Sequence, residues 1–277
     1  MTANIKFFGN YPVPLAIAGS AAYLYAKTQV GYDARIAYSL INGTIKGALA
    51  ERNDKINVWY ILEYHAKSKK NAHIAFIVYE GREWTYREVY DIVLQYATWM
   101  KSKYSITPGE VVAMDVMNSA EFIFLQLAIW SLGARPAFTN YNLTGKPLLH
   151  CLRTSTARVI FVDEDLRSQF SQDIKDELES ASFRDGQGAM EVVVLDLWVR
   201  QEIEKTEGVR EPDDVRAGIK GRDMSSLIYT SGTTGLPKPG IIAWSKYFVG
   251  GIFCSTWLGL KRSDRFYTVS PETLYKR

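Results

Sequence analysis

The chain after residue 58 alternates between apolar segments of strand length and longer segments with helical spacing. Residues 74–79 (IAFIVY) form a continuous apolar run, which is typical of a strand. Thr85 then precedes a segment whose apolar positions recur every three or four residues, and Glu88 follows three residues after Thr85. This arrangement predicts a helix that begins with a capping box.

The same alternation continues toward the C-terminus. Residues 111–117 (VVAMDVM) predict a strand, and residues 120–132, apolar nearly all round, predict a buried helix ended by Gly133. Three further short apolar runs predict strands, at residues 158–162, 191–195 and 226–229. Strands that alternate with helices predict an α/β fold, in which helices flank both faces of a mainly parallel sheet.

The first 57 residues have a different pattern. In the segment 31–57 the apolar positions fall at spacings near three and four, which predicts an amphipathic helix. Residues 11–26 (YPVPLAIAGSAAYLYA) carry no charge but fall short of the roughly 20 residues that a spanning helix needs. A short membrane anchor and a buried helix both fit this run. A signal peptide is disfavoured, because Lys6 alone supplies the positive charge and no clear cleavage site follows.

Composition and charge exclude several classes of function. The chain has 277 residues, of which 47% are hydrophobic and 23% charged, as in ordinary globular proteins. The net charge of +3 and the absence of a Lys/Arg-rich run argue against a nucleic-acid partner. Cys151 and Cys254 form neither a disulfide framework nor a CxxC motif, which favours a reducing compartment. The three histidines are scattered without ligand spacing, so we predict no protein-held metal site.

Candidate chemistry concentrates in residues 228–238 (IYTSGTTGLPK), called here the signature segment. Its glycines allow the backbone to turn close to a ligand, and successive backbone N–H groups in such a turn can bind an anion. The hydroxyl groups of its Ser and Thr residues add donors, and Lys238 adds a positive charge suited to a polyphosphate. The spacing is neither that of a Walker P-loop nor that of a GxGxxG dinucleotide motif.

The complete string is more specific than its composition. It resembles the AMP-binding signature of the adenylate-forming superfamily, which includes acyl-CoA synthetases, luciferases and the adenylation domains of peptide synthetases. The resemblance implies that this loop surrounds the β- and γ-phosphates of ATP, with Lys238 and Thr233 as its catalytic residues. The implied nucleotide-binding residues are Tyr229, Thr230, Ser231, Gly232, Thr233, Thr234, Gly235 and Lys238.

The resemblance also implies the reaction and its cofactors. A carboxylate attacks the α-phosphate of ATP to give an acyl-adenylate and pyrophosphate, and the thiol of CoA then displaces AMP. ATP, Mg²⁺ and CoA are therefore the implied cofactors, and the protein contributes mainly positioning and neutralisation of charge.

A narrower resemblance covers most of the chain. Residues 84–93, 109–118 and 130–150, above all PAFTNYN at 136–142, resemble the fungal form of the fatty acid transport proteins, the very-long-chain acyl-CoA synthetases. The implied substrate is a long- or very-long-chain fatty acid, activated in connection with fatty acid uptake. This branch carries an N-terminal hydrophobic segment, which favours membrane association through residues 11–26. The implied domains are 1–57, an N-terminal apolar and amphipathic segment, and 58–277, an incomplete AMP-binding domain.

Departures from the family pattern leave other functions open. No histidine follows Pro271, Pro239-Gly240 stands where a small residue usually follows the lysine, and the second half of a synthetase does not appear. We therefore expect a truncated chain that lacks full activity by itself. A non-catalytic, membrane-associated fatty-acid-binding protein and an adenylating enzyme for another carboxylic acid are the alternatives. The expected location is the cytosolic side of the endoplasmic reticulum, plasma membrane, lipid droplet or peroxisome; chain length and oligomeric state are not predicted.

Overall fold

The computed structural model describes residues 13–28, 30–184, 188–230 and 235–267. The chain divides into two units, Met1–Lys46 with Val249–Asp264 and Gly47–Phe248 with Arg265–Arg277. Each unit is described by itself. The predicted domain boundary at residue 57 stays a prediction.

A six-stranded sheet forms the centre of the larger unit, which confirms the predicted α/β fold. Its strands lie in the order β6-β5-β3-β4-β7-β8. All neighbouring strands run parallel except β7 and β8, which are antiparallel. Their bounds are β3 Val111–Asp115, β4 Arg135–Phe138, β5 Val159–Asp163, β6 Glu191–Leu195, β7 Met224–Thr230 and β8 Lys238–Ala243.

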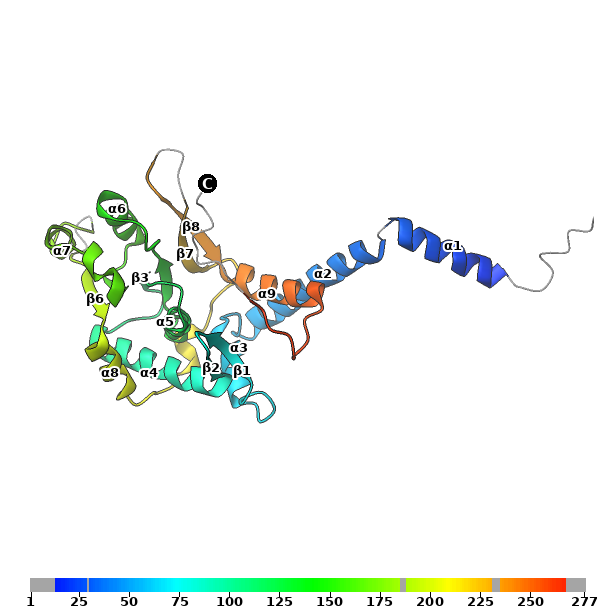
Figure 1. The fold of residues 1–277 in the computed structure, drawn as a ribbon, viewed down its shortest axis with the longest axis horizontal. Helices are drawn as coiled ribbons and strands as arrows, with labels where there is room; N and C mark the ends of the chain where they lie inside the picture. Colours follow the sequence, from blue (N-terminus) through cyan, green and yellow to red (C-terminus); the bar gives the residue numbers. More distant parts are fainter. Residues whose placement is uncertain (1–12, 29, 185–187, 231–234, 268–277) are drawn as a thin grey trace, which may run out of the picture. The chain divides into compact units, whose positions relative to one another are not determined.

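Helices cover both faces of this sheet (Figure 1). On one face, side chains of α3, α4, α5 and α8 share a core with alternate residues of the strands. On the other face, α6 and α7 pack against the remaining strand residues. Their bounds are α3 Trp59–Lys67, α4 Tyr86–Tyr104, α5 Ala120–Ser131, α6 Gly145–Ser155, α7 Gln172–Glu179 and α8 Leu197–Glu204, with short 3₁₀ helices η1 Glu164–Gln169 and η2 Asp213–Arg216.

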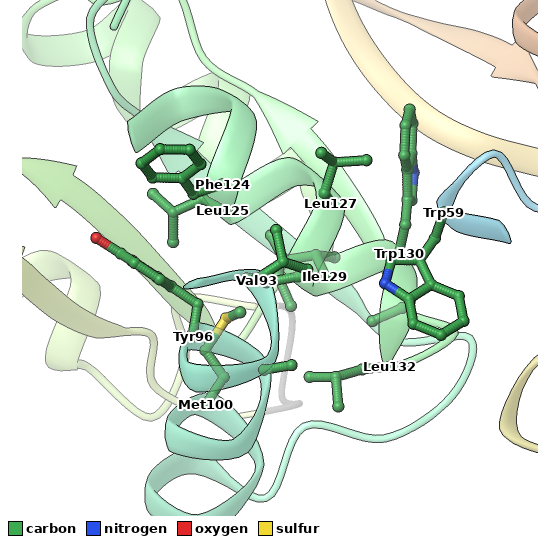
Figure 2. Close-up of a cluster of buried hydrophobic side chains, with 14 of the residues drawn as sticks. Trp59, Val93, Tyr96, Met100, Phe124, Leu125, Leu127, Ile129, Trp130 and Leu132 are labelled. Atoms are coloured by element: carbon green, nitrogen blue, oxygen red, sulfur yellow. The ribbon is translucent and has the colours of Figure 1, made fainter. Parts of the chain in front are cut away.

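The main core lies between α4 and α5 (Figure 2). Val93 and Met100 on α4 and Leu125 and Ile129 on α5 are all essentially inaccessible to solvent, and Trp59 of α3 extends the cluster. Burial of each such aliphatic side chain contributes about 1.5–3 kcal/mol. This packing fixes α5, and therefore the two strands that α5 connects, β3 and β4.

The ends of α4 and α5 follow the predicted local chemistry. The Thr85 hydroxyl accepts a hydrogen bond from the Glu88 N–H at 3.2 Å, and the Glu88 carboxylate accepts one from the Thr85 N–H at 2.7 Å, which confirms the capping box. Gly133, with φ of +73°, follows α5, and a Cβ atom there would lie 2.1 Å from the Val215 carbonyl oxygen. Only glycine fits this position.

The run 74–79 forms a strand, but outside the parallel sheet. β1 (Ala75–Tyr79) pairs antiparallel with β2 (Arg82–Thr85) in a separate two-stranded sheet. Glu80 and Gly81 both have positive φ, as a two-residue hairpin turn requires. Half-buried and exposed residues alternate along β1, so its apolar run does not mark a strand covered on both faces.

The smaller unit is helical, with α1 (Val13–Thr28), the first part of α2 (Val30–Arg52) and the last part of α9 (Trp244–Leu258). The predicted helix in 31–57 is confirmed as α2, but its large apolar residues Leu40, Ile41 and Ile45 are 54–58% exposed. The buried side of the same segment carries Ser39 and Gly43 instead. A Cβ atom on Gly43 would lie 3.1 Å from Val249 of α9, so small residues allow the two backbones to approach closely.

The apolar run 11–26 coincides largely with α1, which has 16 residues. Across the described part of the chain, no helix combines the length and the apolar character needed to cross a membrane.

Candidate functional site

The described ends of the signature segment lie at the carboxyl edge of the parallel sheet. The segment begins in β7, whose neighbour β4 runs parallel to it, with Phe138 opposite Ile228. Ligands of open α/β sheets bind outside the carboxyl ends of the strands. Of the predicted site residues, Tyr229, Thr230, Gly235 and Lys238 are described, whereas Ser231, Gly232, Thr233 and Thr234 lie outside the described residues.

Pairing between β7 and β8 brings the two ends of the signature segment together. Thr230 is opposite Lys238, and Tyr229 is opposite Pro239. Both Thr230 and Lys238 are exposed, and Gly235 has φ of +88°, a conformation that other residues rarely adopt. The structure thus places Lys238, the predicted cation, opposite Thr230, which carries a hydroxyl predicted to bind phosphate.

The unusual loop exit, Pro239-Gly240, is accommodated by its position in β8. Because β8 is the last strand of the sheet, the backbone nitrogen of a proline there can face away from β7, so that the absence of an N–H costs no hydrogen bond between the strands. Gly240 lies opposite Ile228, and a Cβ atom on it would come within 3.3 Å of the Ile228 carbonyl oxygen. The segment after Lys238 is therefore a closely paired strand, which the sequence did not predict.

Helix α6 contacts both ends of the signature segment. The Tyr229 hydroxyl donates a hydrogen bond to the Cys151 carbonyl oxygen at 2.7 Å. His150 Nε2 lies 3.1 Å from the Pro237 carbonyl oxygen, and because a carbonyl can only accept, the ring nitrogen must donate. Burial is the main cause that raises the pKa of Tyr229 to about 12, so its hydroxyl stays protonated as a donor. The nucleotide-binding role of Tyr229 stays a prediction.

Two buried polar groups at the same edge have no partner among the residues that the structure describes. Asp115 ends β3 and is fully buried, and neither of its carboxylate oxygens is hydrogen-bonded. Burial, reinforced by the charge of Asp163, raises the pKa of Asp115 to about 7. The hydroxyl of Thr139, directly after β4, is likewise buried without a partner. Sequence reasoning missed both residues, although an aspartate within the apolar run VVAMDVM was a visible signal.

A polar cavity of about 500 Å³ lies between the carboxyl ends of β3 and β5. The chain leaves β3 toward β4 and leaves β5 toward β6, on the opposite side, so this crevice is the topological switch point of the sheet. Arg200 lines the cavity, but it is paired with Glu121 at 2.8 Å and with Glu164 at 3.3 Å. Carboxylates thus outnumber the cation here, which makes the cavity unsuited to a polyphosphate and favours the signature segment as the anion site.

The described part of the chain offers no group of three or more His, Cys, Asp or Glu side chains that could hold a metal ion. The described part of the site therefore places the exposed Lys238 opposite the exposed Thr230, with Gly235 at positive φ between them in the sequence. Such an arrangement can bind and neutralise a polyanion.

Comparison with known proteins shows matches over most of the chain. The family model of the AMP-binding enzymes matches residues 62–271. A very long-chain fatty acid transport protein of Cochliobolus heterostrophus is 29% identical over 94% of this chain and 40% of its own length. The very long-chain fatty acid transport protein of Saccharomyces cerevisiae is 34% identical over 68% of this chain and 28% of its own length.

Among solved structures, an anthranilate CoA ligase in complex with anthranoyl-AMP is 26% identical, with a TM-score of 0.55 over 69% of this chain and 34% of that one. The chain therefore spans 40% or less of the length of these relatives. The resemblance predicted from the signature segment and from residues 136–142 is confirmed by these matches.

Proposed function

Because this chain belongs to the AMP-binding enzyme family, we propose that it carries the polyphosphate-binding part of an enzyme that activates a long- or very-long-chain fatty acid. The proposed overall reaction forms an acyl-adenylate from ATP and the acid, and then an acyl-CoA. The observation that carries the proposal is the position of Lys238, exposed and opposite Thr230 at the carboxyl edge of a parallel sheet. The names of the two fungal relatives support the fatty acid as substrate.

The residues of this chain act on the triphosphate rather than on the acid. Lys238 supplies a positive charge to the β- and γ-phosphates, and the hydroxyl and backbone N–H groups of the signature segment supply hydrogen bonds. These contacts hold the α-phosphate in line for attack by the carboxylate and stabilise the charge of the departing pyrophosphate. Mg²⁺ neutralises phosphate charge in such reactions, and we expect it to be held largely through the phosphate oxygens.

Binding of MgATP by the 277-residue chain tests this proposal. Calorimetric titration is expected to show binding that Lys238→Ala weakens at least about tenfold, because a charge-assisted contact is worth about 1.5–3 kcal/mol. Lys69→Ala, which removes an exposed lysine outside the site, is the matched control and is expected to leave the affinity unchanged. Equal affinities for wild type and Lys238→Ala would remove Lys238 from the proposed role.

Complete turnover is a separate expectation. Since the chain spans at most 40% of the length of these relatives, we expect it to form no acyl-CoA when tested alone with ATP, CoA and a long-chain acid. Thioester formation measured by chromatography is the assay. Sustained turnover by the isolated chain would show that these residues suffice for both half-reactions.

Activation of an aryl acid is the second candidate. It is favoured by the 26% identity to the anthranilate CoA ligase structure. If the chain supports exchange of pyrophosphate into ATP, a panel of a C16 acid, a C24 acid and anthranilate separates the candidates. Exchange that depends on anthranilate alone would favour the aryl acid.

Membrane association through the N-terminal helices also stays a proposal. Its support is the exposure of Tyr23, Leu24 and Tyr25 on α1 and of the apolar residues Leu40 and Ile41 on α2. Exposed apolar surface of this kind can insert into the interfacial layer of a bilayer without spanning it. Co-sedimentation with phosphatidylcholine vesicles is expected for wild type and is expected to fall for the double variant Leu40→Gln, Ile41→Gln.

A further inference from the structure

Two consecutive residues of α6 contact the two described ends of the signature segment. On the entry side, the Tyr229 hydroxyl donates to the Cys151 carbonyl oxygen at 2.7 Å. On the exit side, His150 Nε2 donates to the Pro237 carbonyl oxygen at 3.1 Å. These two bonds, called here the α6 clamp, connect positions that are 78 and 87 residues apart in the sequence.

The helix that carries the clamp is itself firmly held. Leu148 and Leu152 of α6 are fully buried against a core that includes Ala113 of β3 and Ile160 of β5. Cys151 is also fully buried. Because α6 is anchored on the central strands, it can hold Tyr229 and Pro237, which contact it, in fixed positions.

The exit contact acts on the peptide group that precedes Lys238. The carbonyl of Pro237 and the N–H of Lys238 belong to one planar peptide, so a bond to that carbonyl also orients the start of Lys238. On the other side of the same peptide, Lys238 is already paired with Thr230 in the β7–β8 ladder. The hydrogen bond from His150 and the pairing with Thr230 therefore restrain Lys238, the residue that we assign to polyphosphate binding.

We propose that His150 is a positioning residue: its Nε2–H holds the Pro237–Lys238 peptide and so sets how strongly Lys238 contributes to the binding of a polyphosphate. This inference rests on the proposed function, because it assumes that the segment binds the phosphates of ATP. His150 is only half-buried, so its replacement leaves no large cavity in the core. Its effect is therefore on ligand binding more than on folding.

The test compares two variants that differ in the donor they retain. Glutamine carries an amide N–H at a position similar to His Nε2, whereas leucine has a similar volume and no donor. Titrations of the 277-residue chain with MgATP and with inorganic tripolyphosphate are expected to show that His150→Leu weakens both about threefold to tenfold, the range for loss of one hydrogen bond. His150→Gln is expected to stay within about twofold of wild type, with unchanged melting temperatures throughout.

Each outcome has a distinct meaning. If His150→Leu binds both ligands as well as wild type does, or if His150→Gln is no better than His150→Leu, the positioning role is wrong. If His150→Leu does not fold, His150→Ala also removes the donor and is expected to weaken tripolyphosphate binding by a similar factor; unchanged binding would overturn the inference. If wild type binds neither ligand, the proposed function fails, and this inference fails with it.

Discussion

Two buried carboxyl groups of the larger unit have opposite surroundings. Glu63 accepts hydrogen bonds from the Arg210 guanidinium, the Lys67 ammonium and the Tyr90 hydroxyl. Asp115 accepts none from the residues that the structure describes. Burial alone would raise the pKa of Glu63, but its partners, chiefly Arg210 and Lys67, lower it to about 2. For Asp115, burial and the charge of Asp163 raise the pKa to about 7.

The difference separates scaffold from candidate site. Glu63 belongs to an ion network in which Arg210 also pairs with Asp213, and the buried Arg216 lies over the Trp59 ring at 4.3 Å. This network holds residues 210–216 on α3, and the charges of Glu63, Arg210 and Asp213 are satisfied within the protein. Asp115, by contrast, lies at the edge of the sheet where ligands bind. Buried polar groups without partners are rare in folded proteins, and a catalytic role is one of the explanations for them.

The largest expected effect comes from breaking the satisfied network. Glu63→Gln takes from the Arg210 guanidinium one of its two carboxylate partners, the other being Asp213, and removal of one partner of a buried ion pair costs about 3–5 kcal/mol. Urea unfolding at pH 7 should show a loss of this size. The exposed Glu83→Gln is the matched control and should change the free energy of unfolding by less than about 0.5 kcal/mol.

The pH dependence of this loss has a definite sign. The folded-state pKa of Glu63 is depressed, so its contribution is present above its ordinary value of 4.5 and is lost as the pH falls toward about 2. The difference between wild type and Glu63→Gln should therefore shrink over that window. A difference that is constant from pH 7 to pH 2 would contradict the assignment of Glu63 as the charged centre of the network.

Asp115 should show the opposite dependence. Its folded-state pKa is raised from 3.8 to about 7, so its ionisation opposes folding increasingly as the pH rises through that window. Asp115→Asn removes this cost and should stabilise the protein at pH 8 by on the order of 2–4 kcal/mol, with a smaller gain at pH 5. Unfolding free energies of the two proteins at both pH values test this. Greater stability of wild type at pH 8 would mean that the Asp115 carboxylate has a partner after all.

Thr139→Val should have the smallest effect. The hydroxyl of Thr139 is buried without a partner, and valine has nearly the same shape, so the substitution should stabilise the fold by about 1 kcal/mol. Thr154, whose hydroxyl donates to the His150 carbonyl oxygen at 2.8 Å, provides the control. Thr154→Val should be neutral or destabilising, and a Thr139→Val variant less stable than wild type would show that the hydroxyl is satisfied.

The sequence predicted most strands of the sheet and the signature segment, but not the contacts between residues far apart in the chain. Continuous apolar runs predicted β3, β5, β6 and β7. The signal is clearest for β5, because a strand that is buried on both faces has no polar positions between its apolar ones. The signature segment was found because its residue types and order carry the chemistry directly. The capping box of Thr85 and Glu88 was predicted for the same reason, since it is a local pattern.

What was missed depends on partners far away in the chain. β8 contains a proline and a glycine, so its pairing with β7 has no local signal. The bond from His150 to Pro237 joins residues 87 positions apart, and no periodicity can predict it. The apolar stripe of α2 predicted a helix correctly, but Leu40 and Ile45 are exposed because small residues on the other side, such as Gly43, make the close contact with α9.

We propose that MgATP binds at the carboxyl edge of the sheet, at Lys238 and beside α6. Hydrogen–deuterium exchange of the 277-residue chain with and without MgATP tests it most directly. We predict added protection in the peptides that cover residues 224–243 and 145–155, and none in the α3 peptide 58–67. Protection centred on α3, or no change anywhere at saturating MgATP, would contradict the account.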